Sequence, residues 1–210
     1  MSESRRWPKI AAIILAGGRG LRLGHRDKAL VPLAGSPLIE HVLAAITPIA
    51  EETLIVSNRP QALRRYGLRV VSDEVLGAGP LGGIYTGLRH ARYRVNLVVG
   101  CDMPFVSGDL VRHMISVSPG TDAVVPRIGR FIEPLCALYD RNLIDTMEDA
   151  LGSARFKIGD LLLRVHTHYV TEEIVRGFDP KLLSFMNVNT PEDLGRAEEV
   201  IAGEWEDRIG

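Results

Sequence analysis

The chain has 210 residues and a net charge of −1, and 46% of its residues are hydrophobic and 24% charged. This length suits one substantial core, and the composition is ordinary for a soluble globular protein. A net charge so close to zero gives no general attraction to nucleic acid or to an anionic membrane, so we expect neither as a partner. An anionic ligand must therefore be held by a local cluster of cations.

The predicted elements begin with a continuous apolar run at residues 10–15, which is typical of a strand buried on both faces. Apolar residues at helical spacing then predict a helix over residues 37–47, with Pro37 in its first turn. Further strands are expected at residues 53–56, 68–71, 95–100, 123–126, 134–139 and 165–170, and further helices at residues 61–66, 82–91, 109–117 and 141–151. A last helix, running to about residue 202, is predicted after the capping sequence that starts at Asn189.

The alternation of strands and helices predicts a three-layer α/β/α domain with a mostly parallel sheet. The pattern becomes less regular after residue 127. We therefore expect one domain over residues 1–210, with a nucleotide-binding half at about 10–126 and a second half at about 127–202 that holds the acceptor substrate.

A glycine-rich basic segment, Leu15 to Lys28, directly follows the first predicted strand. Its glycines permit close approach of the backbone to a ligand, and its cations can hold phosphates. These residues are Gly17, Gly18, Gly20 and Gly24, with Arg19, Arg22, Arg26 and Lys28. The spacing matches neither the dinucleotide-binding GxGxxG loop nor the P-loop, since Leu23 replaces the last glycine and no hydroxyl follows Lys28. We interpret the segment as a binding loop for a nucleoside triphosphate.

Asp102 follows the predicted strand at 95–100. A carboxylate at the end of a buried strand is costly unless it pairs with a cation or a metal. Mg²⁺ commonly binds one or two carboxylates together with substrate phosphates, so Asp102 is a candidate metal ligand. The alternative is that this aspartate only caps a turn or a helix.

Other polar residues stand beside predicted strand ends. Asn58 follows the second strand, and Asp73 precedes the glycine-rich segment 77–83, which could also be a plain connection. Near the end of the chain, Asn187 and Asn189 flank Val188 and would share one face of an extended strand. Thr190 is expected to cap the last helix.

These motifs together resemble the molybdenum cofactor guanylyltransferases and the broader group of glycosyltransferase-like nucleotidyltransferases. The matching segments run in the family's order from about residue 11 to residue 200, and they are LAGGRGLRLGHRDK, CDMP, GPLGG and NVNTPEDL. The resemblance implies a Rossmann-like, glycosyltransferase A-like fold. It implies nucleotide binding by Leu15, Ala16, Gly17, Gly18, Lys28, Asn58, Asp73 and Asp102, catalysis by Arg22, Lys28 and Asp102, and acceptor binding by Asn187, Asn189 and Arg155. The segment at Glu133 also stands where the family contacts substrate.

The family's reaction is transfer of GMP from GTP to the terminal phosphate of molybdopterin, with Mg²⁺, or alternatively Mn²⁺, held by Asp102. An enzyme of the same fold that uses CTP, or that serves another phosphate acceptor, stays an alternative. A nucleotide-binding regulator without chemistry is another, although an intact Asp102 argues against it. The resemblance also implies transient contact with proteins of cofactor synthesis or molybdoenzyme maturation.

The two cysteines and the amino terminus bear on the compartment. Cys101 and Cys136 lie in apolar surroundings and form no CxxC pair, so we expect buried free thiols. The apolar run at 10–16 is too short for a membrane span and lacks the form of a signal peptide. We therefore expect a cytoplasmic protein.

Overall fold

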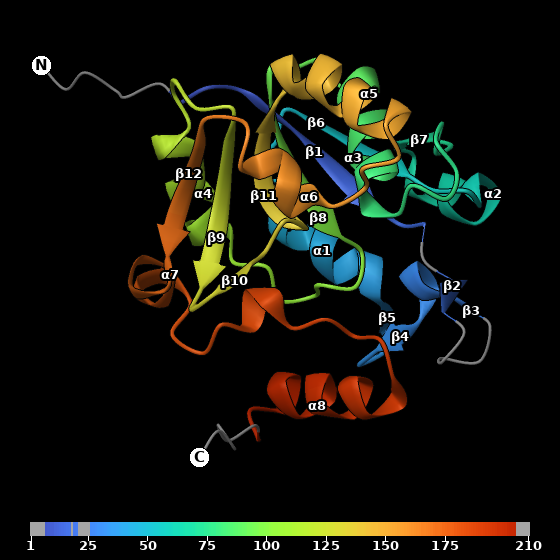
Figure 1. Cartoon of the computed structure of the whole chain (residues 1–210). Helices are drawn as coiled ribbons and strands as arrows, with labels where there is room; N and C mark the ends of the chain where they lie inside the picture. The colour runs from blue at the N-terminus through green and yellow to red at the C-terminus, as the bar shows by residue number, and fades with distance from the viewer. Residues whose placement is uncertain (1–6, 18, 21–25, 205–210) are drawn as a thin grey trace, which may run out of the picture.

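The computed structural model describes residues 7–17, 19–20 and 26–204 (Figure 1). The strands are β1 (Ile10–Leu15), β2 (Arg19–Gly20), β3 (Arg26–Asp27), β4 (Pro32–Leu33), β5 (Ser36–Pro37), β6 (Glu52–Val56), β7 (Arg69–Val71), β8 (Val95–Gly100), β9 (Ala123–Ile128), β10 (Phe131–Ile132), β11 (Cys136–Asp140) and β12 (Thr167–Thr171). The α-helices are α1 (Leu38–Ile46), α2 (Pro60–Leu63), α3 (Pro80–His90), α4 (Gly108–Val117), α5 (Ile144–Gly152), α6 (Ile158–Leu162), α7 (Glu172–Phe178) and α8 (Pro191–Ala202). Short 3₁₀ turns are η2 (Lys28–Leu30), η3 (Arg64–Tyr66), η4 (Arg141–Leu143) and η5 (Leu183–Phe185).

In the part of the chain that the structure describes, the central sheet has eight strands in the order β10-β9-β11-β8-β1-β6-β7, with β12 also paired to β9. Strands β8, β1, β6 and β7 are parallel, which confirms the predicted mostly parallel sheet. Strand β11 runs antiparallel between β8 and β9. The second half of the chain therefore adds β11 between two strands of the first half. The expected boundary between the two halves, near residue 126, falls inside β9.

Helices cover both faces of the sheet, as predicted, and the side chains of β1 alternate between the two faces. Ile14 packs into a cluster with residues of α1, α4 and α7. Ile13 packs into the opposite cluster, with residues of α3, α5 and α6. The two layers lie on either side of the sheet in Figure 1. The three-layer α/β/α fold is confirmed.

Helix α3 lies unusually close to β1, because glycines face the strand. A Cβ added to Gly87 would collide with the Ile13 side chain, and one added to Gly83 would lie 3.2 Å from Leu15 Cδ2. The helix begins at Pro80, two residues earlier than expected, because Gly79 adopts a positive φ of 61° that turns the chain into the first helical residue. The segment 77–83 is thus part turn and part helix.

Most predicted elements lie within two residues of the observed ones, and those at 10–15 and 95–100 match. The helix expected at 141–151 is divided into η4 and α5. Helices α6 and α7 were not predicted, because five and seven residues give too short an apolar period to recognise. None of the helices in the described ranges is both long and apolar enough to cross a membrane.

Helix α8 packs against β4 and completes a third apolar cluster. This cluster contains Val31, Leu33, Leu38, Val188 and Ala197. Thr190 caps the helix, as predicted, and forms a reciprocal capping box with Asp193. The segment just before α8 is thereby fixed against the amino-terminal part of the chain.

Candidate functional site

A cavity of about 470 Å³ opens at the carboxyl ends of β1, β6, β7 and β8. This is the edge of an open parallel sheet at which ligands usually bind. The lining residues are Leu15, Gly17, Lys28, Val56, Ser57, Asn58, Asp73, Gly77, Gly79, Pro80, Gly83, Gly100, Cys101, Asp102 and Leu135. Six of the residues named from the sequence therefore share one cavity: Leu15, Gly17, Lys28, Asn58, Asp73 and Asp102.

Lys28 connects three separate parts of the chain at one end of this cavity. Its ammonium group donates hydrogen bonds to Asp102 Oδ2 and to Asn189 Oδ1. The lysine begins the short turn η2, which Asp27 caps by accepting a bond from the Ala29 N–H at 3.2 Å. The exposed fractions of the Lys28 and Asp102 side chains are only 12% and 16%, so the ion pair is largely shielded from water. A shielded cation next to a carboxylate is the arrangement expected where phosphates and a metal meet.

Asp102 lies directly after β8, and its carboxylate folds back over Gly100. A Cβ at position 100 would collide with Asp102 Oδ1, so this conformation needs the glycine. Among the described residues, Oδ1 receives no hydrogen bond, whereas Oδ2 is bound by Lys28. No group of three or more acidic, histidine or cysteine side chains in the described ranges could hold a metal ion alone. One free carboxylate oxygen fits a divalent cation that takes its other ligands from substrate phosphates and water.

The end of β1 supplies the floor of the cavity. Leu15 and Gly17 line it, but Ala16 is buried beneath: its N–H donates to Val56 O at 2.8 Å, and its carbonyl accepts from Ser57 Oγ at 3.0 Å. Ala16 is thus placed in the framework of the loop and not on the cavity wall. Gly18 and Arg22, which were also named from the sequence, lie outside the described residues.

Asn58 and Asp73 form the other end of the cavity. The Asn58 side-chain oxygen accepts a bond from the Asp73 N–H at 3.2 Å, so the two residues hold each other in place. In the order β8-β1-β6-β7, three strand spacings separate this end from Asp102, which is about 14 Å. That span allows a nucleotide to lie across the sheet edge with its base at Asp73 and its phosphates at Lys28.

Residues 187–189 do not form the extended strand that we expected. Instead, the buried Val188 donates its N–H to the Asp102 carbonyl at 2.9 Å, which attaches this segment to the end of β8. Asn189 reaches Lys28, whereas the Asn187 amide donates to Phe185 O at 3.1 Å. The two asparagines therefore have different surroundings, because η5 and the capping of α8 set the backbone here in place of a sheet partner.

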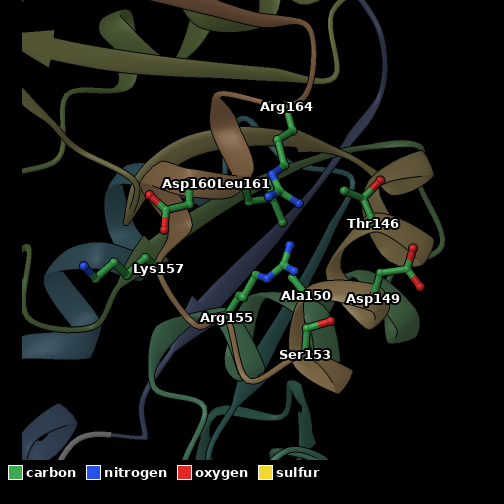
Figure 2. Close-up of a pocket in the computed structure, with 9 residues that line it drawn as sticks. All are labelled: Thr146, Asp149, Ala150, Ser153, Arg155, Lys157, Asp160, Leu161 and Arg164. Carbon is green, nitrogen blue, oxygen red and sulfur yellow. The ribbon is translucent and has the colours of Figure 1, made fainter.

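Arg155 lies apart from these residues, in a second cavity of about 340 Å³. The cavity is formed by α5, the following loop and α6, and Figure 2 shows the Arg155 and Arg164 guanidinium groups pointing toward each other inside it. Lys157 adds a third cation, and Asp149 and Asp160 add two carboxylates. Neither arginine has an ion-pair partner among the described residues.

Two polar residues around the first cavity were not found from the sequence. Ser57, which follows β6, joins the ends of β1 and β6, because its hydroxyl donates to the Ala16 carbonyl. The same hydroxyl accepts a hydrogen bond from the Arg59 N–H at 3.1 Å. Thr86, buried in α3, contacts Asp73. Neither residue stands in a recognisable motif. Their contacts with distant parts of the fold are what place them at the cavity.

The sequence of the chain is similar to those of known nucleotidyltransferases. The family model of the MobA-like NTP transferase domain matches residues 12–168. A probable molybdenum cofactor guanylyltransferase of Pelotomaculum thermopropionicum is 39% identical, with 88% of this chain and 90% of that protein covered. A molybdenum cofactor guanylyltransferase of Syntrophotalea carbinolica is 37% identical, with 87% and 88% covered.

A solved structure extends the likeness to three dimensions. The crystal structure of molybdopterin-guanine dinucleotide biosynthesis protein A from Archaeoglobus fulgidus superimposes with a TM-score of 0.80 at 36% identity, covering 92% of this chain and 99% of that one. Fold, motifs and sequence identity over nearly the whole chain thus agree. The chain is a nucleotidyltransferase that belongs to the MobA-like NTP transferase family.

Proposed function

We propose that the protein transfers GMP from GTP to the terminal phosphate of molybdopterin, which yields molybdopterin guanine dinucleotide and pyrophosphate. The observation that carries this proposal is the contact of Lys28 with both Asp102 and Asn189. It joins the glycine-rich loop, the carboxylate after β8 and the segment before α8 at one end of the nucleotide-sized cavity. Relatives at 39% and 37% identity carry the name of this activity.

In the proposed reaction, an oxygen of the acceptor phosphate attacks the α-phosphorus of GTP, and the bond to the bridging oxygen of the β-phosphate breaks. The acceptor phosphate is already ionised, so the site needs no strong general base. Lys28 lies where it can stabilise the charge on the triphosphate and on the departing pyrophosphate. The catalytic contribution of the protein is alignment and charge stabilisation, as in phosphoryl transfer generally.

Asp102 would hold a divalent cation, Mg²⁺ or Mn²⁺, through its free oxygen. When bound, the cation neutralises phosphate charge during the transfer. Lys28 fixes the other carboxylate oxygen and so sets the orientation of the side chain. The shielding of this pair from water increases the strength of both interactions.

The nucleotide base is assigned to the end of the cavity at Asn58 and Asp73. Because Asn58 uses its oxygen to bind Asp73, its amide hydrogens remain to donate, while Asp73 offers a carboxylate oxygen as acceptor. One donor beside one acceptor suits the edge of guanine, and it also suits cytosine. A CTP-dependent enzyme of the same fold therefore stays the second candidate.

The acceptor is assigned to the side of Lys28 that faces the carboxyl-terminal segment. Asn189 is already in contact with Lys28, and Val188 is anchored to Asp102. Asn187 is included on the family resemblance alone. Arg155, with Arg164 in the second cavity, offers guanidinium groups for anionic parts of the acceptor outside the reacting centre.

Pyrophosphate release measured with GTP, CTP, ATP or UTP, with and without molybdopterin, tests the proposal. We expect release to need a divalent cation, molybdopterin and GTP. Lys28→Ala should lower kcat about 100- to 1,000-fold at saturating GTP, in keeping with the loss of a preorganised donor. The exposed Lys9, which only approaches Glu51 at 3.9 Å, provides the control Lys9→Ala.

Each outcome of this experiment separates the candidates. Turnover with CTP in place of GTP would identify the cytidylyltransferase alternative. Tight nucleotide binding without pyrophosphate release under any condition would identify a regulator. Near-normal turnover of Lys28→Ala at saturating GTP would refute the assigned role of Lys28.

A further inference from the structure

The buried hydroxyl of Thr86, in the middle of α3, faces the end of the cavity at Asp73. We propose that Thr86 is a positioning residue that orients the Asp73 carboxylate and thereby sets the selectivity for the nucleotide base. The inference rests on the proposed function, because it assumes that Asp73 contacts the base. Thr86 itself is fully buried and does not line the cavity.

The direction of the Thr86 hydroxyl proton follows from its neighbours. The hydroxyl oxygen accepts a hydrogen bond from the Glu74 N–H at 3.0 Å. Its own proton is then donated to Asp73 Oδ1, at 3.3 Å. A threonine inside a helix commonly binds the carbonyl of the preceding turn, so a bond across to a loop carboxylate is a specific arrangement.

A second donor fixes the same oxygen of Asp73. The Val75 N–H lies 3.0 Å from Oδ1, so two donors bind this atom. Oδ2 has no hydrogen-bond partner in the part of the chain that the structure describes. The carboxylate is thereby held with one oxygen turned inward and one left to accept from a base N–H or exocyclic amine.

Helix α3 also fixes the loop that carries Asp73. A Cβ on Gly82 would lie 2.7 Å from the Val75 carbonyl and 3.3 Å from Asp73 Oδ1, so loop and helix touch through the bare backbone of this glycine. Thr86 lies one turn further along the same face. The carboxylate therefore takes its direction from α3 and not from the loop alone.

The consequence concerns binding more than chemistry. The Lys28 end, to which the reaction is assigned, is separated from Asp73 by three strand spacings, or about 14 Å. A freely rotating Asp73 carboxylate should therefore weaken nucleotide binding without slowing the reaction of bound substrate. Discrimination between bases should fall for the same reason, since a site that orients one acceptor rejects a base that lacks the matching donor.

Five variants test the inference in steady-state assays with GTP and with inosine triphosphate, which lacks the 2-amino group. The isosteric Thr86→Val should raise KM for GTP about tenfold, leave kcat unchanged and reduce the preference for GTP over inosine triphosphate. Thr86→Ser, which keeps the hydroxyl, should restore both values. In an Asp73→Asn background, Thr86→Val should have no further effect on KM, because both changes act on one contact. Thr53→Val in β6 is the matched control.

An unchanged KM in folded Thr86→Val, a fall in kcat alone, or additive effects of the two substitutions would overturn the inference. Where Thr86→Val does not fold, as judged by circular dichroism, Thr86→Ala takes its place in the same cycle. Failure of the proposed function is seen separately, as absence of GTP turnover in the unsubstituted protein. In that case, calorimetric binding of each nucleoside triphosphate by the same variants still decides whether Thr86 acts through Asp73.

Discussion

Glu133 is the clearest single residue whose chemistry the assigned roles leave unused. It begins the turn before β11, where its carbonyl accepts a bond from the Cys136 N–H at 3.2 Å. Burial raises the pKa of its carboxyl group above the ordinary value of 4.5, and among the described residues this carboxylate has no cationic partner. The Cys136 thiol lies in the same environment. Its burial, together with the nearby charges of Glu133 and Asp179, raises its pKa to about 12.

Replacing this carboxylate should stabilise the free protein. Because the folded-state pKa of Glu133 is raised, the folded state binds the proton more tightly than the unfolded state, and stability falls as the pH rises from 4.5 through the folded pKa. Glu133→Gln should therefore increase Tm at pH 7 and have no effect below pH 4.5. Thermal unfolding at a series of pH values measures this.

The matched control is Glu198→Gln, which removes an exposed glutamate carboxylate on α8. A lower Tm for Glu133→Gln at pH 7 would contradict the prediction and point to a stabilising contact of the carboxylate. A gain in stability accompanied by weaker acceptor binding would assign this charge to the substrate site.

For single residues, the sequence identified those candidate site residues that stand in recognisable motifs. Lys28, Asp102 and Asp73 were identified because each has a fixed place relative to a strand end or a glycine-rich loop. Thr86 and Ser57 carry no such signal, because a hydroxyl becomes informative only when its partner across the fold is known. Ala16 shows the converse, since it stands inside a binding motif but is buried beneath the cavity and does not line it.

Helix α8 shows at the element scale how a structural cap also orders a functional segment. The Asp193 carboxylate accepts hydrogen bonds from the N–H groups of Thr190 and Asn189, both at 3.0 Å, while Thr190 Oγ1 accepts from the Asp193 N–H. Burial alone would raise the pKa of Asp193, but these bonds and Arg196 lower it below 3.8. The same carboxylate that starts the helix therefore fixes the backbone of the residue that meets Lys28.

Asp193→Ala should have two effects. Loss of the cap should lower the free energy of unfolding by about 1 kcal/mol at neutral pH. Since the folded pKa is depressed, this stabilisation is present above pH 3.8 and is lost as the pH falls through the folded pKa, so variant and parent should converge in acid. Chemical denaturation at pH 7 and in acid checks the first effect.

The second effect is a higher KM for the acceptor with little change in KM for GTP, because Asn189 loses its backbone anchor. Glu192→Ala, at the next exposed position in the same helical turn, is the control. Equal loss of stability in both variants would show that the first-turn charge, and not the capping box, stabilises α8.

Secondary-structure elements were predicted correctly where a capping sequence or a continuous apolar run marks them. The start of α8 was predicted from the capping sequence with Thr190, and β1 from its continuous apolar run. The prediction of a strand at 187–189 was wrong, because the backbone conformation of a short polar segment is set by the groups to which it hydrogen-bonds. Here the partner is the Asp102 carbonyl, which lies 86 residues earlier in the chain.

At the scale of the whole molecule, the residues assigned to the acceptor divide between the segment that contacts Lys28 and the second cavity. Asn189 lies with Lys28, whereas Arg155 lies with Arg164 between α5 and α6 (Figure 2). The class and layers of the fold followed from the alternation of elements. The insertion of β11 beside β8 did not, because strand order is set by packing between distant segments and leaves no local pattern.

The division predicts that contributions to the two substrates can be separated. Arg155→Ala and Arg164→Ala should each raise KM for molybdopterin about tenfold and leave binding of GTP alone unchanged, since neither lines the first cavity. Calorimetry with GTP and steady-state kinetics with the acceptor test this. Arg112→Ala, on α4, is the control, and weakened GTP binding by either variant would show that the two cavities act as one.

The close approach of α3 to β1 limits which positions can be changed when the enzyme is redesigned. Gly83 and Gly87 leave no room for side chains between the helix and β1, so the distance of the helix from the sheet cannot be adjusted by small substitutions. Anyone seeking an enzyme that accepts a different base should leave this helix intact. The adaptable position is Asn58, which lines the open cavity and does not pack against a strand.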